Sequence, residues 1–100
     1  MKRPPKHTDL ISRIRSAVVN EDFFLTEHAI ARMAQRKVAL TDLLYALTTG
    51  WHEAVKDEYS EEFRAWRYAV RGRTVDRREL RVAVALDPDL MVITVIDLGL

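Results

Sequence analysis

The chain has 100 residues, 48% of them hydrophobic, which is enough for one hydrophobic core and leaves no room for a second domain. Lys and Arg number 16 against 15 Asp and Glu, so the chain lacks the basic excess of a strong nonspecific nucleic-acid binder. It has no cysteine, which excludes disulfides, thiolate catalysis and cysteine-based zinc sites. Because no apolar run is long enough for a signal peptide or a bilayer span, we expect a cytoplasmic protein with no membrane segment.

The first part of the chain is expected to hold a lead-in, a helix and a short strand. Residues 1–7 are predicted to be a flexible lead-in to a single α+β domain over residues 8–100. Thr8 is a suitable N-cap for a helix with apolar residues at helical spacing, which would end near Asn20. The apolar residues 23–25 then predict a strand or an extended segment.

Two further helices are predicted before the sheet. Thr26 is a suitable N-cap for a second helix that runs to about Arg36. Thr41 would cap a third helix, and Gly50 stands where the left-handed residue that ends a helix is expected.

From Trp51 onward the apolar period changes to two, which predicts strands. The predicted strands cover roughly residues 51–59, 63–70, 80–86 and 91–97, with a connection over 71–77 and a tight turn at Asp87-Pro88-Asp89-Leu90. Helices followed by sequential strands indicate an α+β fold. We expect two to three N-terminal helices packed on one face of a four-stranded, mainly antiparallel sheet.

Two of the predicted strands carry an arginine on the same face as small alanines. In the strand over 80–86 the even positions are apolar and predict the core face, so Arg81, Ala83 and Ala85 stand on the other face. In the strand over 63–70, Arg67 stands between Ala65 and Ala69. If these faces coincide, Arg67 and Arg81 line one concave basic surface. Alternatively, the alanines accommodate a crossing helix or a partner subunit.

The charges are segregated along the chain, with an acidic segment over 53–62 followed by an arginine-rich segment over 64–81. The preference for arginine over lysine suits planar phosphate or carboxylate recognition, although long arginines could equally solvate an exposed strand face and hairpin. Trp51 and Trp66 could stack on bases, but core packing is the simpler interpretation.

A polar stripe marks the second predicted helix. His28, Arg32 and Arg36 follow one another at steps of four, so their side chains line up on one helix face. His28 falls in the first turn, where the helix dipole disfavours imidazolium and free backbone N–H groups favour an anion. A neutral histidine beside a bound phosphate is suited to act as a general base. The alternative is that the arginines pair with acidic residues of the next segment and His28 is a boundary residue.

Residues 26–38, T-E-H-A-I-A-R-M-A-Q-R-K-V, followed by Thr41-Asp42-Leu43-Leu44 and Gly50, resemble a bacterial family of domains of unknown function with the motif H-A-x-x-R-M-x-x-R. The likeness extends to Ile93-Thr94-Val95. This family resembles the RelE/ParE and MqsR toxins, which implies helices packed on an antiparallel sheet and, as in the RelE and MqsR branches, metal-independent cleavage of mRNA, on the ribosome or free of it. The implied partner is a cognate antitoxin, often a small zinc-binding helix-turn-helix protein, and neither a metal nor another cofactor is expected.

The resemblance, together with the arginine-lined strands, suggests roles for particular side chains. The expected catalytic residues are His28 as base, Arg32, Arg67 and Arg81 for charge stabilisation, and Thr94, which matches the family's last strand. The expected RNA-binding residues are Arg36, Arg71, Arg73, Arg77 and Arg78. Two positions differ from the pattern of many members, because this chain has Arg81 in place of histidine and Ile96 in place of tyrosine. The proton donor for the leaving group is therefore unassigned.

Two other classes of function fit the same sequence. The chain could be a noncatalytic module whose basic sheet face docks RNA or an acidic protein partner. It could also be a self-associating protein in which the acidic segment and the basic hairpin pair between the subunits of a homodimer.

Overall fold

The computed structural model describes residues 2–86 and 88–99, so the predicted turn residue Asp87 lies outside the described part. This part forms three α-helices, six strands and one 3-10 turn. Their bounds are α1 (Leu10–Val19), β1 (Phe23–Leu25), α2 (Glu27–Arg36), α3 (Leu40–Thr49), β2 (Trp51–His52), η1 (Ala54–Lys56), β3 (Glu58–Ser60), β4 (Ala65–Arg73), β5 (Glu79–Ala85) and β6 (Leu90–Gly99).

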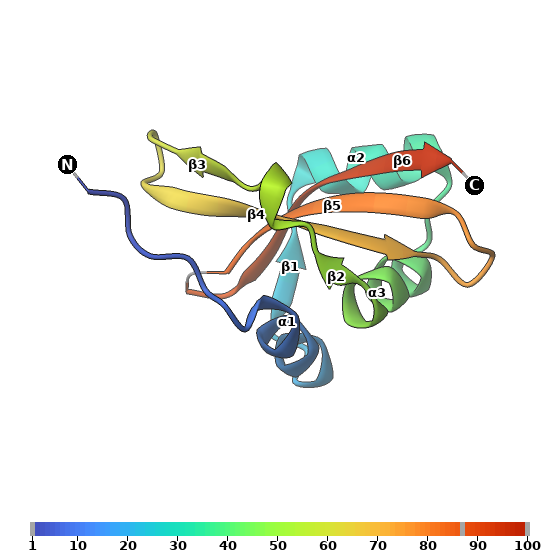
Figure 1. Cartoon of the computed structure of the whole chain (residues 1–100). Coiled ribbons are helices and arrows are strands. Elements are labelled where there is room, and N and C mark those ends of the chain that lie inside the picture. The colour runs from blue at the N-terminus through green and yellow to red at the C-terminus, as the bar shows by residue number, and fades with distance from the viewer. Residues whose placement is uncertain (1, 87, 100) are drawn as a thin grey trace.

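The strands form one mixed, mostly antiparallel sheet with the order β1-β6-β5-β4-β2, and β3 pairs with the start of β4 (Figure 1). Only the pair of β1 and β6 is parallel among the described strands. The predicted α+β class is thus confirmed, with more strands than the four expected. The long central strands β4, β5 and β6 correspond to the last three predicted strands.

The prediction of one strand over 51–59 is wrong, because the chain leaves the sheet at η1 and returns as β3. At the break, the Glu53 N–H donates to the carbonyl oxygen of Ala69 at 2.8 Å. The Asp57 carboxylate then accepts the Ala69 N–H at 2.8 Å, in place of a backbone carbonyl. A side chain therefore completes the β4 edge where a continuous strand was expected.

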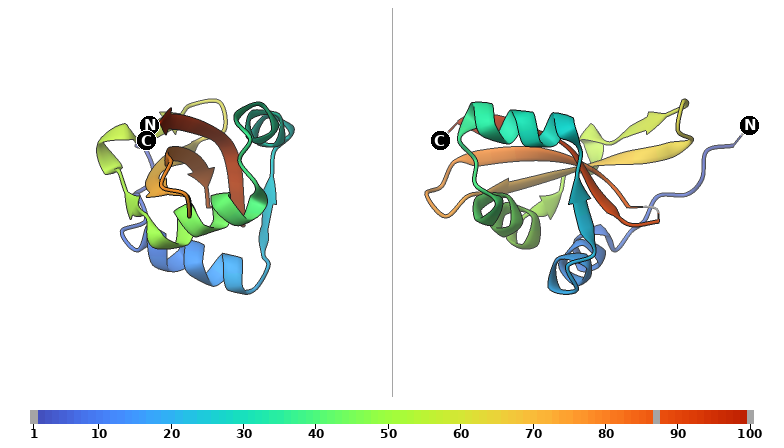
Figure 2. Two further views of the ribbon diagram at one scale, coloured as in Figure 1. Left: turned by 90° about the vertical axis from the view of Figure 1, so that its right-hand side faces the viewer. Right: turned by 180° about the vertical axis from the view of Figure 1, so that it is seen from behind.

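The helices leave one face of the sheet open. α3 packs against β4 and α1 packs against α3, while α2 runs along β6. Viewed end on, α1 and α3 lie beneath the sheet and α2 lies beside β6 (Figure 2). The core contains the even positions of β5, as predicted, with Tyr68 and Val70 of β4 and Leu43 and Leu47 of α3.

The arginine-bearing faces of β4 and β5 coincide, as the sequence suggested. Ala69 lies opposite Ala83, and Arg71 lies opposite Arg81. Directly opposite residues of an antiparallel pair share a face, so these side chains all project from the outer face of the sheet.

Two glycines allow α3 to cross β4 closely. A Cβ at Gly72 would lie 2.2 Å from the carbonyl oxygen of Ala46, and one at Gly50 would lie 2.4 Å from that of Arg71. The prediction of a left-handed Gly50 is wrong, because its φ of −81° and ψ of −164° are extended. Close backbone approach, not helix termination, requires glycine here.

The helix caps were predicted with mixed success. Thr26 caps α2 as expected, accepting the Ala29 N–H at 3.0 Å. The caps assigned to Thr8 and Thr41 are wrong, because α1 and α3 begin after Asp9 and Ala39. The Asp42 carboxylate accepts the Ala39 N–H at 3.1 Å and thereby fixes an earlier start for α3.

The segment expected to be a flexible lead-in is laid against the end of the sheet at β3 and β4. The Trp66 indole N–H donates to the Pro4 carbonyl oxygen at 2.8 Å, and the Lys6 ammonium donates to Asp57 at 2.9 Å. The His7 N–H donates to the Tyr68 hydroxyl at 3.0 Å. None of the described helices is long and apolar enough to cross a membrane.

Candidate functional site

The open sheet face carries a groove of about 780 Å³ between α2 and the hairpin of β3 and β4. We call it the open groove. It is lined by His28 from α2, by Phe63, Trp66 and Arg67 from the hairpin, and by Met91 and Thr94 from β6. The structure thus brings together three of the five predicted catalytic residues, His28, Arg67 and Thr94.

An irregularity in β6 positions the floor of the groove. Thr94 pairs with Ala83 and Val92 pairs with Val84, so Ile93 is an extra residue in the ladder. The Thr26 hydroxyl donates to the Ile93 carbonyl oxygen at 2.9 Å, and the Thr26 N–H donates to the Val92 carbonyl oxygen at 3.0 Å. Since Thr26 also caps α2, these bonds tie the first turn of the helix, and His28 with it, to the floor of the groove.

His28 and Arg67 are exposed on this face. Within residues 2–86 and 88–99, neither side chain has a hydrogen-bond or ion-pair partner. A base and a cation on the walls of one groove are therefore both available to a ligand.

The helix stripe continues the same surface. Arg32 and Arg36 line a depression of about 320 Å³ that also includes Thr94 and Ile96. The Arg32 guanidinium donates to the Gln35 side chain at 3.3 Å. Neither Arg32 nor Arg36 forms an ion pair with a described residue. The alternative pairing with the acidic segment is therefore not formed in the described part of the chain. Thr94 joins this depression to the open groove.

Arg81 and Arg71 differ from the expectation of free cations in an open area, because both are held by carboxylates. Glu53, only 7% exposed, accepts from the Arg81 Nε at 2.7 Å and from the Arg71 Nη1 at 3.1 Å. Glu79 accepts from the Arg71 Nη2 at 2.7 Å. Glu53 of the acidic segment and Glu79 of β5 thus offset the charges of Arg71 and Arg81 within the same chain.

Arg78 has a structural position that the sequence did not indicate. Its guanidinium donates to the carbonyl oxygens of Arg36 at 2.7 Å and Lys37 at 2.8 Å, where α2 ends. Lys37 is the left-handed residue that terminates this helix, with a φ of 54°. Arg78 therefore satisfies the C-terminus of α2, and its donors are not open to RNA.

The pKa values of the paired carboxyls reflect these contacts. The Arg81 guanidinium, helped by Arg71, holds the pKa of the Glu53 carboxyl below its ordinary value, against the opposing effect of desolvation. Arg71 in the same way lowers the pKa of Glu79, and Glu79 raises the pKa of Arg71. Glu53, Glu79 and Arg71 therefore stay ionised at neutral pH.

We expect Glu53→Gln to lower the melting temperature at pH 7 and to weaken its dependence on acid. A pKa that is lower in the folded state contributes stability above the pKa of the unfolded chain, and this contribution is lost as the pH falls through the folded value. Thermal melts between pH 7 and pH 3 should show a smaller acid loss for the variant than for the wild type. Glu62→Gln, at an exposed turn, is the control; equal acid losses for Glu53→Gln and wild type would contradict the assignment.

The two positions that depart from the family pattern lie side by side. Arg81 pairs directly with Ile96 across β5 and β6. Both line a shallow pocket of about 140 Å³ with Arg67 and Thr94. The predicted concave surface containing Arg67 and Arg81 therefore exists, but the charge of Arg81 is offset by Glu53.

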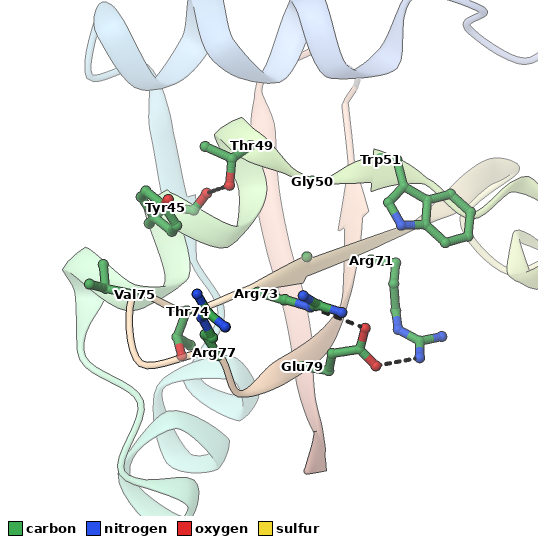
Figure 3. Close-up of a pocket in the computed structure, with 11 residues that line it drawn as sticks. Tyr45, Thr49, Gly50, Trp51, Arg71, Arg73, Thr74, Val75, Arg77 and Glu79 are labelled. Atoms are coloured by element: carbon green, nitrogen blue, oxygen red, sulfur yellow. Dashed lines mark hydrogen bonds and ion pairs between the residues drawn. The ribbon is translucent and has the colours of Figure 1, made fainter. Parts of the chain in front are cut away.

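The remaining predicted RNA-binding residues, Arg73 and Arg77, lie in a separate pocket with Trp51 (Figure 3). Core packing is wrong for Trp51, which is 56% exposed, whereas the partly buried Trp66 does pack against the core. The contributions of Phe63 and Met91 to the open groove were missed, because periodicity alone does not distinguish an exposed apolar residue from a core residue.

The fold and the groove define an α+β domain with a histidine and cations on an open sheet face. Among the described residues, no three His, Asp or Glu side chains are grouped to hold a metal ion. Residues 25–97 match the family described as a domain of unknown function, DUF4258. The chain belongs to this family, since the match runs from the end of β1 into β6 and contains the whole open groove. Comparisons with curated proteins and with solved structures gave no match.

Proposed function

We propose that this chain is the toxin of a toxin–antitoxin pair and acts as a metal-independent endoribonuclease on mRNA. The observation that carries the proposal is the open groove, which combines the unpartnered His28 and Arg67 of the described chain with Thr94. The resemblance of the family motif to the RelE/ParE and MqsR toxins supports the same function. The proposal places the protein in the cytoplasm with a cognate antitoxin, for which a zinc-binding helix-turn-helix protein is the expected class.

The proposed reaction is an attack by a ribose 2′-hydroxyl on the adjacent phosphorus. His28 takes the hydroxyl proton while the bond from O2′ to phosphorus forms and the bond from phosphorus to O5′ breaks. Arg67 stabilises the extra negative charge on the phosphoryl oxygens, which is worth a few kcal/mol for a well-aimed donor. The products are a 2′,3′-cyclic phosphate and a 5′-hydroxyl. Arg32 and Arg36 contact neighbouring phosphates along the helix stripe.

The leaving O5′ takes its proton from water in this proposal. Among the side chains that line the open groove, His28 is the only one of a type that commonly acts as a general acid or base. It already serves as the base. Because a positioned proton donor contributes about 10²- to 10⁴-fold, we expect a slow nuclease.

The proposal is tested with the purified protein on single-stranded RNA, with and without a chelator. The expected result is cleavage that a chelator does not stop, with 2′,3′-cyclic phosphate ends, and growth arrest when expression is induced in bacteria. A chain that leaves RNA intact, alone and with ribosomes, and that does not slow growth would overturn it.

Ile96→Tyr is expected to increase the rate of cleavage by about tenfold or more. Ile96 is exposed and lies beside Thr94 and Arg67 in the shallow pocket, so a tyrosine there returns a hydroxyl proton donor to the family's position. The measurement is the single-turnover rate on a short RNA. Ile96→Phe is the matched control, and equal rates for the two variants would argue against the missing donor.

The pairing of Arg81 with Glu53 and the presence of Ile96 favour a second candidate, a noncatalytic module that docks RNA or an acidic protein through the open face. Such a module would bind RNA without cutting it, and its affinity would fall steeply as salt increases. Intact RNA in a complex that dissociates with salt would distinguish this candidate from the nuclease.

A further inference from the structure

A second concavity lies at the other end of β4 from the open groove. It has a volume of about 740 Å³ and includes Tyr45 of α3, Trp51 of β2, Arg73 of β4 and Arg77 of the turn between β4 and β5 (Figure 3). We call it the Trp51 pocket. None of the catalytic residues of the open groove belongs to it.

Trp51 presents an aromatic surface that the fold does not use. The side chain is 56% exposed, although it stands in a strand directly after a helix. Trp51 pairs with Arg71, so both project from the outer face of the sheet. An exposed indole at the edge of a pocket can stack on the face of any nucleobase.

Two arginines of the Trp51 pocket, Arg73 and Arg77, are exposed. Arg77 has no side-chain hydrogen bond or ion pair within the described residues. Its backbone N–H donates to the Thr74 carbonyl oxygen at 2.9 Å, which fixes the turn. The Arg73 side chain is 66% exposed and forms an ion pair with Glu79 at 3.6 Å, while the other oxygen of Glu79 accepts from Arg71 at 2.7 Å. The guanidinium groups of Arg73 and Arg77 lie between Tyr45 and Trp51 in the view of Figure 3.

The Trp51 pocket and the open groove share β4, and the pocket continues round the edge of the sheet to Tyr45 and Thr49 of α3. Arg67 lines the groove and Arg73 lines the Trp51 pocket, and their positions in β4 differ by an even number, so both side chains project from the same face of the strand. At about 3.3 Å per residue the two positions are about 20 Å apart. That span matches about six nucleotides at the stacked rise of ~3.4 Å per nucleotide.

We propose that the Trp51 pocket is a distal nucleotide site for single-stranded RNA, with a base stacked on Trp51 and its phosphate held by Arg73 and Arg77. The same RNA strand runs along β4 to the open groove, where its scissile phosphate lies at His28 and Arg67. This inference rests on the proposed function, because it takes RNA as the ligand. The combination of an exposed tryptophan with arginine side chains favours a nucleic acid over an acidic protein segment, which would use the cations but gain little from stacking.

The test measures binding of a labelled 2′-O-methyl oligonucleotide of about ten nucleotides, which spans both sites and cannot be cleaved because its 2′-oxygen carries no proton. We expect Trp51→Ala to weaken the Kd by about 5- to 150-fold and Trp51→Phe to keep most of the affinity. Arg77→Ala should reduce the slope of log affinity against log salt by about 0.7. Arg13→Ala, on α1 and paired only with Asp9 among the described residues, is the control and should bind as the wild type does. Thermal melts establish that each variant is folded.

A trinucleotide separates the two sites, because it is too short to reach from the open groove to the Trp51 pocket. Trp51→Ala should leave cleavage of the trinucleotide unchanged while slowing cleavage of the longer RNA at subsaturating concentration.

If the folded Trp51 and Arg77 variants bind and cut the long RNA as the wild type does, the distal site is wrong and the nuclease stands. If the variants lose affinity for an RNA that is never cut, the nuclease is wrong and the distal site stands. Wild-type binding to an acidic peptide through Trp51, without affinity for the oligonucleotide, would overturn RNA as the ligand.

Discussion

His28→Ala is expected to reduce RNA cleavage by about 10²- to 10⁴-fold and to relieve growth arrest, while the protein stays folded. The imidazole is the proposed base, and it lies on the wall of the open groove. It is exposed and without a partner among the described residues, so its removal leaves no cavity and no unsatisfied group. The free energy of unfolding should therefore change by no more than about 0.5 kcal/mol.

Single-turnover cleavage and urea unfolding of the same samples separate the two effects. His28→Gln keeps a polar side chain of similar length without the base and should be as inactive as His28→Ala. Glu27→Gln, one residue earlier on α2 and outside the groove, is the control and should cleave normally. Normal cleavage by His28→Ala would show that the base lies elsewhere.

The largest loss of stability is expected from Gly72→Ala. The added Cβ would lie 2.2 Å from the Ala46 carbonyl oxygen and within 3.0 Å of two further backbone atoms of the same residue. These atoms belong to α3, so the clash can be relieved only by moving the helix away from β4. We expect a cost of about 3 kcal/mol or more, which is a large part of the stability of a domain of this size.

Urea unfolding followed by circular dichroism measures this loss. Gly99→Ala is an informative control, because its new Cβ would meet nothing within 4 Å although its φ is +92°. Gly99→Ala should lower the free energy of unfolding by only about 1 to 2 kcal/mol, the cost of an unfavourable backbone conformation. If Gly72→Ala were no less stable than Gly99→Ala, steric exclusion would not explain the glycine.

The sequence alone determined the features that depend on local periodicity and capping. The apolar repeat and Thr26 predicted α2, and the steps of four predicted the stripe of His28, Arg32 and Arg36 on one side of it. The even positions of β5 were correctly assigned to the core. These features follow from the geometry of a single helix or strand, so neighbouring residues are sufficient to specify them.

The extra residue in β6 shows what local patterns cannot specify. Strict alternation from the buried Val92 would turn Thr94 toward the core and Val95 outward. The bulge at Ile93 reverses this, so Val95 is buried and Thr94 lies on the open face. Thr26 stabilises the bulge from another element, and no pattern within the strand reveals such a contact.

Only the tertiary structure decided which arginines are paired within the fold. Glu53 pairs with Arg81 and Arg71, and Arg78 caps the C-terminus of α2, whereas Arg67 stays available on the same face. Glu53 is 18 residues from Arg71 and 28 from Arg81 in the sequence, and Arg36 is 42 residues from Arg78. A charged side chain has the same local pattern whether it pairs across the fold or meets solvent. The placement of α2, η1 and the bulge therefore decides the charge of the open groove.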